Sequence, residues 1–147
     1  MPKTTTKPKP VGPSALRSVA LPPIGQAWPG EGGVFAGLLK GEDGDYAVIV
    51  PLDPASDIDA APWTEAIAAA AKFKSAQHQD YAAATRAELA LCFHNVPELF
   101  TKDWYWSSSP YAGYASYAWY QHFTTGTQNY GRKDTQLRAR AVRRLKI

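Results

Sequence analysis

The residue types that could carry out catalysis or bind a metal do not have the spacing of a known site. His78, His94 and His122 are isolated, and none belongs to a His-x-x-x-His pair. Cys92 is the only cysteine, which excludes an internal disulfide and any multi-cysteine metal site. The serines at 107–109 lack a Gly-x-Ser-x-Gly turn, and no Gly-Lys-Ser phosphate loop occurs. We therefore predict a protein without enzymatic activity, cofactor or metal.

The segment 104–145 favours binding instead, because aromatic, small polar and basic residues are interleaved there. Trp106, Trp119 and Phe123 are expected to anchor a core. The tyrosines are too numerous to bury together unless their hydroxyls find partners, so some should face outward. The contact residues that we predict are Ser109, Tyr111, Tyr114, Ser116, Tyr120, His122, Thr124 and Tyr130. Each tyrosine fits equally well the interpretation of an amphipathic residue at a sheet edge.

These side chains need strands to position them. We predict strands at 105–108, 117–123, 128–130 and 137–145, with a turn at 124–127. Because side chains alternate along a strand, Trp119 and Phe123 should face the core, and Tyr120 and His122 the opposite side.

The closing strand carries four arginines in the run Leu-Arg-Ala-Arg-Ala-Val-Arg-Arg at 137–144. Apolar and basic residues alternate until Ala141 and then slip in phase, which indicates a bulge or a strand covered on both faces. The arginines have three interpretations: partners for carbonyls and for the acidic middle of the chain, a phosphate-binding surface, or a solvated face. We favour the first, since alternation places Arg138 and Arg140 on one side.

Charge supports that preference. Residues 31–103 carry twelve acidic and five basic groups, whereas residues 104–147 carry seven basic and one acidic, and residues 1–30 carry four basic and none acidic. The basic ends could meet acidic surfaces on this chain or on neighbouring subunits. A net charge of +3 with an acidic middle makes nucleic-acid binding the weaker interpretation.

The first half of the domain should contain a β-hairpin and two helices. Apolar runs at 32–39 and 45–50 flank an acidic, glycine-containing turn that lacks calcium-loop spacing. One helix should begin after Pro62 and continue to Phe73, with Trp63, Ile67, Ala70 and Ala71 on its buried stripe. A second should follow the capping box of Thr85 and Glu88 and end at Pro97, with Leu89, Cys92, Phe93 and Val96 on its apolar face.

The N-terminal segment 1–31 reads as an extended, proline-rich arm. It is either a free tail or a segment that docks on its own domain or on a partner subunit. Docking would use its apolar residues Leu16, Val19, Leu21, Ile24 and Trp28. A chain of 147 residues can bury one core, so we expect one domain at 32–147. We expect no membrane span and no signal peptide, and synthesis in the cytoplasm.

The order of these elements and several short motifs resemble a known family of domains. The motifs Thr-Arg-Ala-Glu-Leu at 85–89, Tyr-Trp-Ser-Ser-Ser at 105–109, Tyr-Ala-Trp at 117–119, Phe123 and the arginine run at 137–144 resemble the C-terminal domain of bacterial collagen-like adhesins. Similar domains occur in phage-encoded proteins and in variable proteins of diversity-generating retroelements. The resemblance covers about 32–145. It implies an α+β, C-type lectin-like fold in which two helices pack on small antiparallel sheets, and a rigid scaffold that displays a binding surface between Trp106 and Leu137.

The sequence departs from the wider family in two respects. Ala83-Ala84 replaces the usual Leu-Pro, and the calcium-dependent sugar motifs are absent. Lone Cys92 also excludes the paired-cysteine chemistry of the related formylglycine-generating enzymes.

We therefore predict a non-enzymatic, virion-associated phage protein at the tail or particle surface. Its arm would dock on other virion subunits, and its aromatic, polar face would recognise a host-surface protein or glycan. The alternatives are a structural decoration or assembly protein whose aromatic face is a subunit interface, homo-oligomers included, and a nucleic-acid-binding module that uses Arg132, Lys133 and Arg143.

Overall fold

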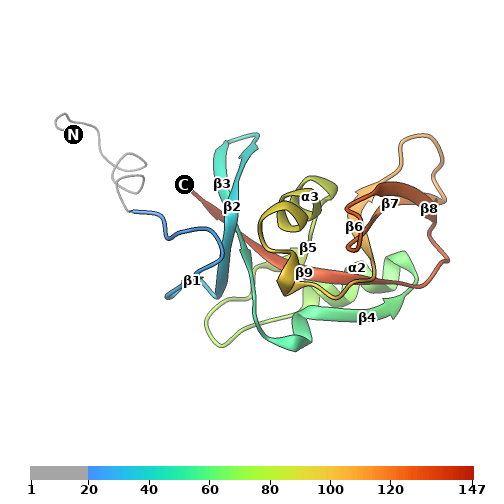
Figure 1. Ribbon diagram of the computed structural model, residues 1–147. Coiled ribbons are helices and arrows are strands. Elements are labelled where there is room, and N and C mark those ends of the chain that lie inside the picture. The colour runs from blue at the N-terminus through green and yellow to red at the C-terminus, as the bar shows by residue number, and fades with distance from the viewer. Residues whose placement is uncertain (1–19) are drawn as a thin grey trace.

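A computed structural model describes residues 20–147 as a mixed α+β structure (Figure 1). Its helices are α2 (Trp63–Lys72) and α3 (Arg86–Asn95), with short 3-10 turns at Pro54–Ser56 and Pro97–Leu99. Its strands are β1 (Ala27–Trp28), β2 (Gly33–Gly41), β3 (Gly44–Val50), β4 (Asp57–Ala61), β5 (Tyr81–Ala83), β6 (Trp104–Pro110), β7 (Tyr117–His122), β8 (Gln128–Arg132) and β9 (Leu137–Lys146). The predicted hairpin, the two helices and the four closing strands are confirmed.

The strands form one nine-stranded sheet in the order β1-β2-β3-β9-β6-β7-β8. Strands β4 and β5 also pair with β9. The expectation of small antiparallel sheets is wrong in size, because β9 is long enough to pair with four other strands and joins them in one large sheet. It is antiparallel to β3, β4 and β5, and parallel to β6 at Tyr105 and Arg138.

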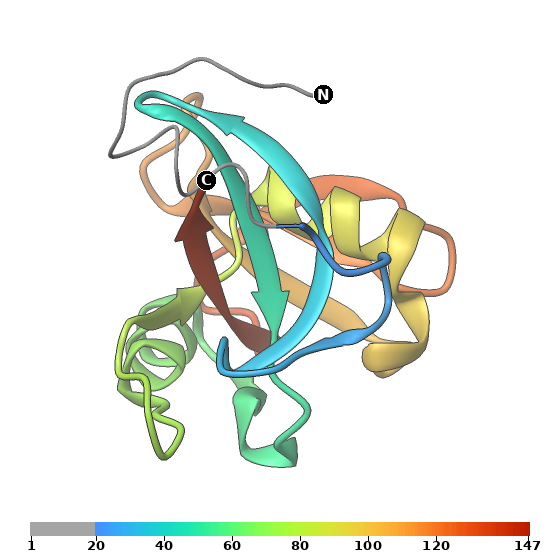
Figure 2. The same cartoon turned by 90° about the vertical axis from the view of Figure 1, so that its left-hand side faces the viewer.

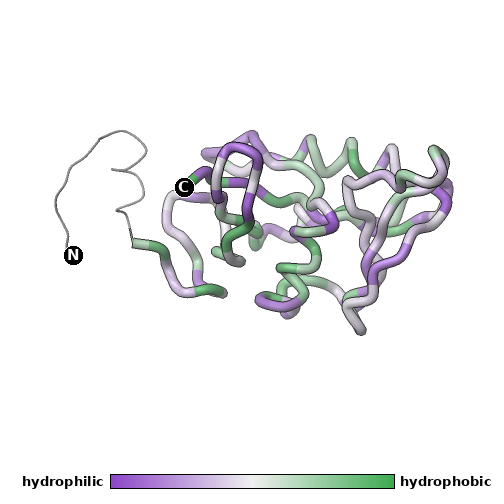
Figure 3. The backbone as a smooth tube through the Cα atoms, turned by 90° about the horizontal axis from the view of Figure 1, so that it is seen from above, coloured by the Kyte–Doolittle hydropathy of each residue, from purple (hydrophilic) through white to green (hydrophobic). Residues whose placement is uncertain are grey.

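The hairpin of β2 and β3 turns at Glu42 and Asp43, as its acidic loop predicts. Gly44 follows with φ of 109°, a conformation that side chains disfavour. The tip is solvent-exposed, and its hydrophilic residues are purple in Figure 3. It is therefore a solvated turn.

The two helices lie on opposite sides of β9 (Figures 1 and 2). Helix α3 begins at the predicted capping box: the Thr85 hydroxyl accepts from Glu88 N at 3.1 Å, and the Glu88 carboxylate accepts from Thr85 N at 2.8 Å. Helix α2 follows Pro62, but it buries Ala66 and Ala70 while Ala71 is exposed. The prediction is thus confirmed for Ala70 and wrong for Ala71, and Ala66 is a buried position that it did not include.

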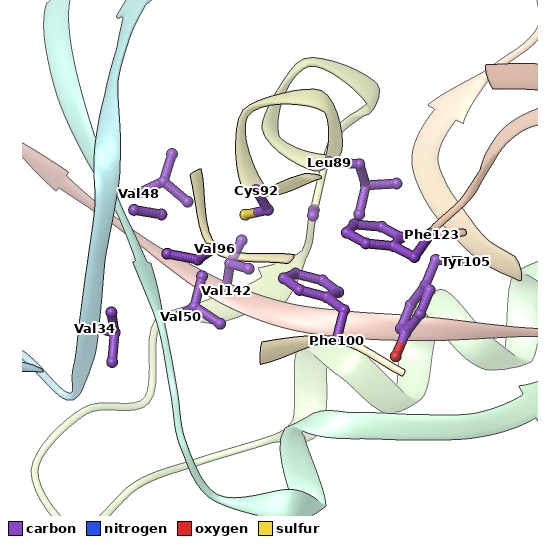
Figure 4. Close-up of a cluster of buried hydrophobic side chains, with 12 residues drawn as sticks. Val34, Val48, Val50, Leu89, Cys92, Val96, Phe100, Tyr105, Phe123 and Val142 are labelled. Carbon is purple, nitrogen blue, oxygen red and sulfur yellow. The ribbon is translucent and has the colours of Figure 1, made fainter. Parts of the chain in front are cut away.

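The main core lies between α3 and the sheet (Figure 4). Leu89, Cys92 and Val96 pack there against Val142 of β9. Phe100 and Phe123 stack with ring centroids 4.3 Å apart. Cys92 is fully buried, which confirms it as a core residue, and this burial raises the pKa of its thiol to about 12. Smaller clusters on the other side join Ala66 and Ala70 to alternate residues of β9.

Strand β9 alternates between these two cores without a break. Ala139 and Ala141 face α2, whereas Val142 faces α3. The strand is buried from Ala139 to Arg143. Of the two predicted explanations for the change of pattern, coverage on both faces is therefore the correct one.

The arginines of β9 are bound by the chain itself, as the favoured interpretation predicts. Arg140 is 4% exposed and donates to the Ser56 hydroxyl at 3.1 Å, to Pro51 O at 2.7 Å and to Leu99 O. Its guanidinium also lies over Phe100, 4.8 Å from the ring centroid. Burial without a carboxylate in contact lowers the pKa of Arg140.

The other three arginines pair with carboxylates of the acidic middle segment. Arg138 lies 3.3 Å from both Asp57 and Asp103. Arg143 lies 2.9 Å from Glu31 and 2.7 Å from Asp80. Arg144 pairs with Glu88, so all four side chains are engaged within the described residues.

Glu88 joins three elements that are distant in the sequence. Its carboxylate is fully buried and accepts two bonds of 2.6 Å from Arg144 and one of 2.8 Å from the Tyr46 hydroxyl, besides the capping bond to Thr85. One side chain thereby joins the start of α3 to β3 and β9. Burial, followed by the bond to Glu88, raises the pKa of Tyr46 to about 12.

The end of the expected arm that lies within the described residues contacts its own domain. Trp28 packs edge-on against Phe35 at 5.5 Å, and Ala27 pairs with Val34, so the sheet begins inside the segment expected as arm. Leu21 and Ile24 remain 41% and 50% exposed. Leu16 and Val19 lie outside the described residues.

Within residues 20–147, no helix is long and apolar enough to cross a membrane.

We expect Glu88→Gln to destabilise the fold by about 3 kcal/mol, because removing one partner of a buried ion pair leaves the other charge uncompensated. Urea unfolding measures this. Glu42→Gln, in the exposed hairpin turn, is the matched control and should change stability by less than about 0.5 kcal/mol. Equal stability of the two variants would contradict the role of Glu88.

We expect the protein to lose stability at alkaline pH because of Tyr105. Its fully buried hydroxyl donates to Asp57 at 2.8 Å and accepts from Thr101 N at 3.0 Å, and burial raises its pKa from 10.0 to about 12. Between these values the unfolded chain loses the proton and the folded chain keeps it. The contribution is thus complete below pH 10.0 and is lost as the pH rises towards about 12.

The free energy of unfolding measured across that window should fall less steeply in Tyr105→Phe, by up to about 1.4 kcal/mol per pH unit. Tyr46 and Cys92 still titrate in the variant, so a smaller slope should remain. An unchanged slope would show that the pKa of Tyr105 is the same in the folded and the unfolded chain.

Candidate functional site

Five aromatic side chains gather on one face of β7 and β8. Tyr117 and Trp119 are two residues apart in β7, so their side chains lie on the same face, and Trp119 lies opposite Tyr130 of β8. Tyr111 and Tyr114 reach the same face from the loop between β6 and β7. We call Tyr111, Tyr114, Tyr117, Trp119 and Tyr130 the aromatic face.

The rings contact one another closely. Tyr111 stacks on Tyr130 with centroids 3.8 Å apart and planes 8° apart, and it meets Trp119 edge-on at 5.5 Å. Tyr114 lies 5.8 Å from Tyr111 and 5.2 Å from Tyr117. Tyr114 is 58% and Tyr130 37% exposed, while the other three rings are half-buried. The neighbouring Tyr130 hydroxyl raises the pKa of Tyr111.

Backbone contacts hold the loop that carries Tyr111 and Tyr114. Tyr111 N and Tyr117 O are 3.0 Å apart, and Lys133 donates to Ser116 O from its backbone and to Ala115 O from its side chain. A Cβ at Gly113 would lie 2.4 Å from the Tyr111 ring. A side chain at this position would therefore displace the Tyr111 ring.

Arg86, at the start of α3, covers Trp119. Its guanidinium carbon lies 3.4 Å from the centroid of a Trp119 ring, a close cation–π contact. Arg86 Nε donates to the Gln128 side chain at 3.2 Å, and its backbone N donates to the Ser109 hydroxyl at 3.2 Å. The aromatic face is thus attached to the N-terminus of α3.

Two glutamines on β7 and β8 fix this attachment. Gln121 is fully buried and donates to Leu89 O of α3 at 2.8 Å. Gln128 donates to the Gln121 side-chain oxygen at 2.7 Å and to Arg86 O at 2.6 Å. The two side chains lie opposite each other across the strands. The sheet beneath the aromatic face is therefore locked to the helix by satisfied polar groups.

The predicted contact residues fall on two surfaces. Tyr111, Tyr114 and Tyr130 belong to the aromatic face, and Ser109 lies beside it under Arg86. Tyr120 and His122 point to the other side of β7, where Trp104 meets them edge-on at 5.0 and 4.3 Å. The remaining two, Ser116 and Thr124, are exposed in loops. The structure thus separates residues that the sequence analysis placed together, because neighbouring side chains of a strand point to opposite faces.

Trp119 differs from its predicted role. It does face the side of β7 that carries Phe123, but it is half-buried and belongs to the aromatic face. Gln121, between them, occupies the buried position under α3. Trp106 and Phe123 are buried as predicted.

Sequence reasoning missed Trp119, Tyr117, Arg86 and Trp104 as members of these surfaces. The alternation of Tyr117, Trp119 and Gln121 along β7 is a signal that could have grouped the first two. Nothing in the sequence places Arg86, which is 33 residues from Trp119, over its ring.

Within the described part of the chain, no three His, Cys, Asp or Glu side chains come together as a possible metal site. His78 Nε2 lies 2.8 Å from Gly30 O, far along the chain from the aromatic face. The chemistry that the aromatic face offers is stacking, hydrogen bonding by tyrosine hydroxyls, and a guanidinium.

Comparison with protein-family models finds no match for the chain, and comparison with curated proteins finds none. The resemblance to adhesin C-terminal domains therefore stays an expectation from sequence motifs.

We expect Gln128→Leu to destabilise the fold by about 2 kcal/mol, because the buried oxygen of Gln121 would lose its donor. Gln77→Leu, at an exposed position in the loop before β5, serves as the control. Urea unfolding of both variants gives the comparison. The glutamine pair would have no fixing role if the two variants were equally stable.

Proposed function

We propose that the protein is a non-enzymatic binding protein of a phage particle, which uses the aromatic face to recognise a host-surface protein or glycan. The observation that carries this proposal is the aromatic face itself, in which tyrosines of β7, β8 and the loop before β7 gather on a sheet that is hydrogen-bonded to α3. Tyrosines offer large contact area at a low entropic cost, and they are enriched at recognition surfaces.

The positions of the two ends of the molecule support a division of labour. The first described residues and the C-terminus lie beside β2 and β3, at the end opposite to β7 and β8 (Figure 1). Attachment through the N-terminal segment would leave the aromatic face directed away from the particle. Exposed Leu21 and Ile24 fit a docking role for that segment.

The C-type lectin-like fold is part of the same proposal. Its support is the sequence resemblance together with two helices packed against one mixed sheet. A scaffold of that kind tolerates exchange of surface residues on β7, β8 and the loop before β7, since the core depends on other positions.

The arginines weigh against nucleic acid as the ligand. Arg138, Arg140, Arg143 and Arg144 are bound by carboxylates or carbonyls of the chain, so they do not offer free charges to phosphates. Arg132 pairs with Asp134 at 3.2 Å, and Lys133 lies over Trp63 at 4.4 Å.

A subunit interface is the second candidate function, because an exposed aromatic patch also fits a protein that decorates a capsid or tail. Tyr114→Ala combined with Tyr130→Ala separates the two. In the receptor-binding proposal, particles carrying this double variant assemble normally, and adsorption to host cells falls at least about tenfold, since each removed ring is a large contact.

Leu52→Ala provides the control, because Leu52 is 61% exposed and lies outside the aromatic face. It should change neither adsorption nor assembly. Loss of the double variant from purified particles would favour the decoration function, and unchanged adsorption with normal incorporation would refute the receptor-binding proposal.

A further inference from the structure

A second surface lies on the opposite side of β6, β7 and β8 from the aromatic face. Trp104 pairs with His122 and Trp106 with Tyr120 across the strands, so their side chains share this side of the sheet. They border a hollow of about 270 Å³ lined by Trp104, Trp106, Tyr120, Gly131, Thr135 and Leu137. We call it the tryptophan hollow.

The walls of the tryptophan hollow are held in place. Trp106 is fully buried and donates from its indole nitrogen to Ala61 O at 3.1 Å. Trp104 is 40% exposed, yet Tyr120 and His122 contact its ring edge-on. An exposed indole fixed by its neighbours loses little entropy on binding a ligand.

Gly131 makes room for the hollow. A Cβ at this position would lie 2.9 Å from Cε2 of Tyr120, a distance that forces the Tyr120 ring to move. The backbone of Gly131 has no positive φ that would require glycine. The absence of a side chain at Gly131 therefore leaves room for the Tyr120 ring at the edge of the hollow.

The lining residues offer hydrogen bonds but no charge. The Trp104 indole nitrogen, the Tyr120 hydroxyl and the Thr135 hydroxyl make no hydrogen bond to any residue in 20–147. A donor and two hydroxyls that can donate or accept thus adjoin an aromatic wall. A charged ligand would find no oppositely charged partner among the six lining residues.

We propose that the tryptophan hollow is a separate binding site for one uncharged pyranose ring of a glycan. Its volume is just below the range of about 300–1,000 Å³ that is typical of ligand pockets, which limits the occupant to a single ring. The apolar C–H face of a pyranose packs on Trp104, and its hydroxyls pair with the polar groups. A purely apolar ring would leave those groups unpaired, which costs affinity. The site is independent of what the aromatic face binds.

The test is an NMR titration of the whole chain, in which the indole N–H signal of Trp104 is assigned with Trp104→Phe. The probes are methyl glucopyranoside, galactopyranoside and mannopyranoside, and p-cresol as a mimic of a partner's tyrosine. We expect at least one pyranoside to shift the Trp104 signal with saturation, with a dissociation constant of about 1 mM.

Two variants test the geometry. Gly131→Val should close the hollow and lower the affinity for that pyranoside at least about tenfold. Thr135→Val, which keeps the side-chain shape, should lower the affinity several-fold because the hydroxyl is lost. If Gly131→Val fails to fold, Thr135→Val decides alone. Leu52→Ala, outside both the tryptophan hollow and the aromatic face, is the control and should leave the titration unchanged.

The proposal is overturned if no pyranoside gives a saturable shift, or if p-cresol binds more tightly than every pyranoside, which would indicate a pocket for a protein side chain. It is also overturned if Thr135→Val binds as the parent does. None of these results bears on host adsorption through Tyr114 and Tyr130, so the two proposals can fail separately.

Discussion

The buried carboxylate of Glu88 is the contact on which the fold most depends. It caps α3, binds the forked guanidinium of Arg144 and accepts the Tyr46 hydroxyl, so three elements distant in sequence share one charge. A buried carboxylate is tolerated only when its oxygens are fully paired. Here both oxygens have two partners. Helix α3 is therefore tied to β9, and the aromatic face is tied in turn to α3 through Arg86 and the two glutamines.

Strand β9 extends this principle along the middle of the molecule. It is covered on both faces, yet it carries four arginines. Each buried guanidinium needs hydrogen-bonding partners. Those of Arg138 and Arg143 include carboxylates from loops and strands elsewhere in the chain: Glu31, Asp57, Asp80 and Asp103. The basic closing segment and the acidic middle are thus one structural network. That network uses the charge that a nucleic-acid-binding protein would display.

The end of the molecule formed by β6, β7 and β8 has two sides with different chemistry. One carries tyrosines around a guanidinium on Trp119. The other carries an uncharged hollow beside Trp104. The segment 128–136 contributes to both sides, with Tyr130 in the aromatic face and Gly131 and Thr135 in the tryptophan hollow. Both surfaces combine side chains of strands with side chains of loops, and the loop of Tyr111 and Tyr114 is held by hydrogen bonds from Lys133 to Ser116 O and Ala115 O.

Much of the architecture follows from sequence alone, because its signals are local. The capping box of Thr85 and Glu88, the acidic glycine turn after β2 and the alternation within β7 and β9 act over a few residues, and each predicts an element that is present. The pairing of basic and acidic segments also follows from composition. These features need no knowledge of which strands are neighbours.

Tertiary structure decided the rest. One strand joining four others, Arg86 above Trp119, and the separation of Tyr120 and His122 from Tyr111, Tyr114 and Tyr130 all depend on contacts between residues far apart in the chain. Local patterns report that Tyr120 and Trp119 point in opposite directions, but which direction meets α3 depends on the packing of the whole sheet. The sequence therefore determined the elements and the chemistry of their side chains, and the long-range packing of β9 and α3 decided which of those side chains share a surface.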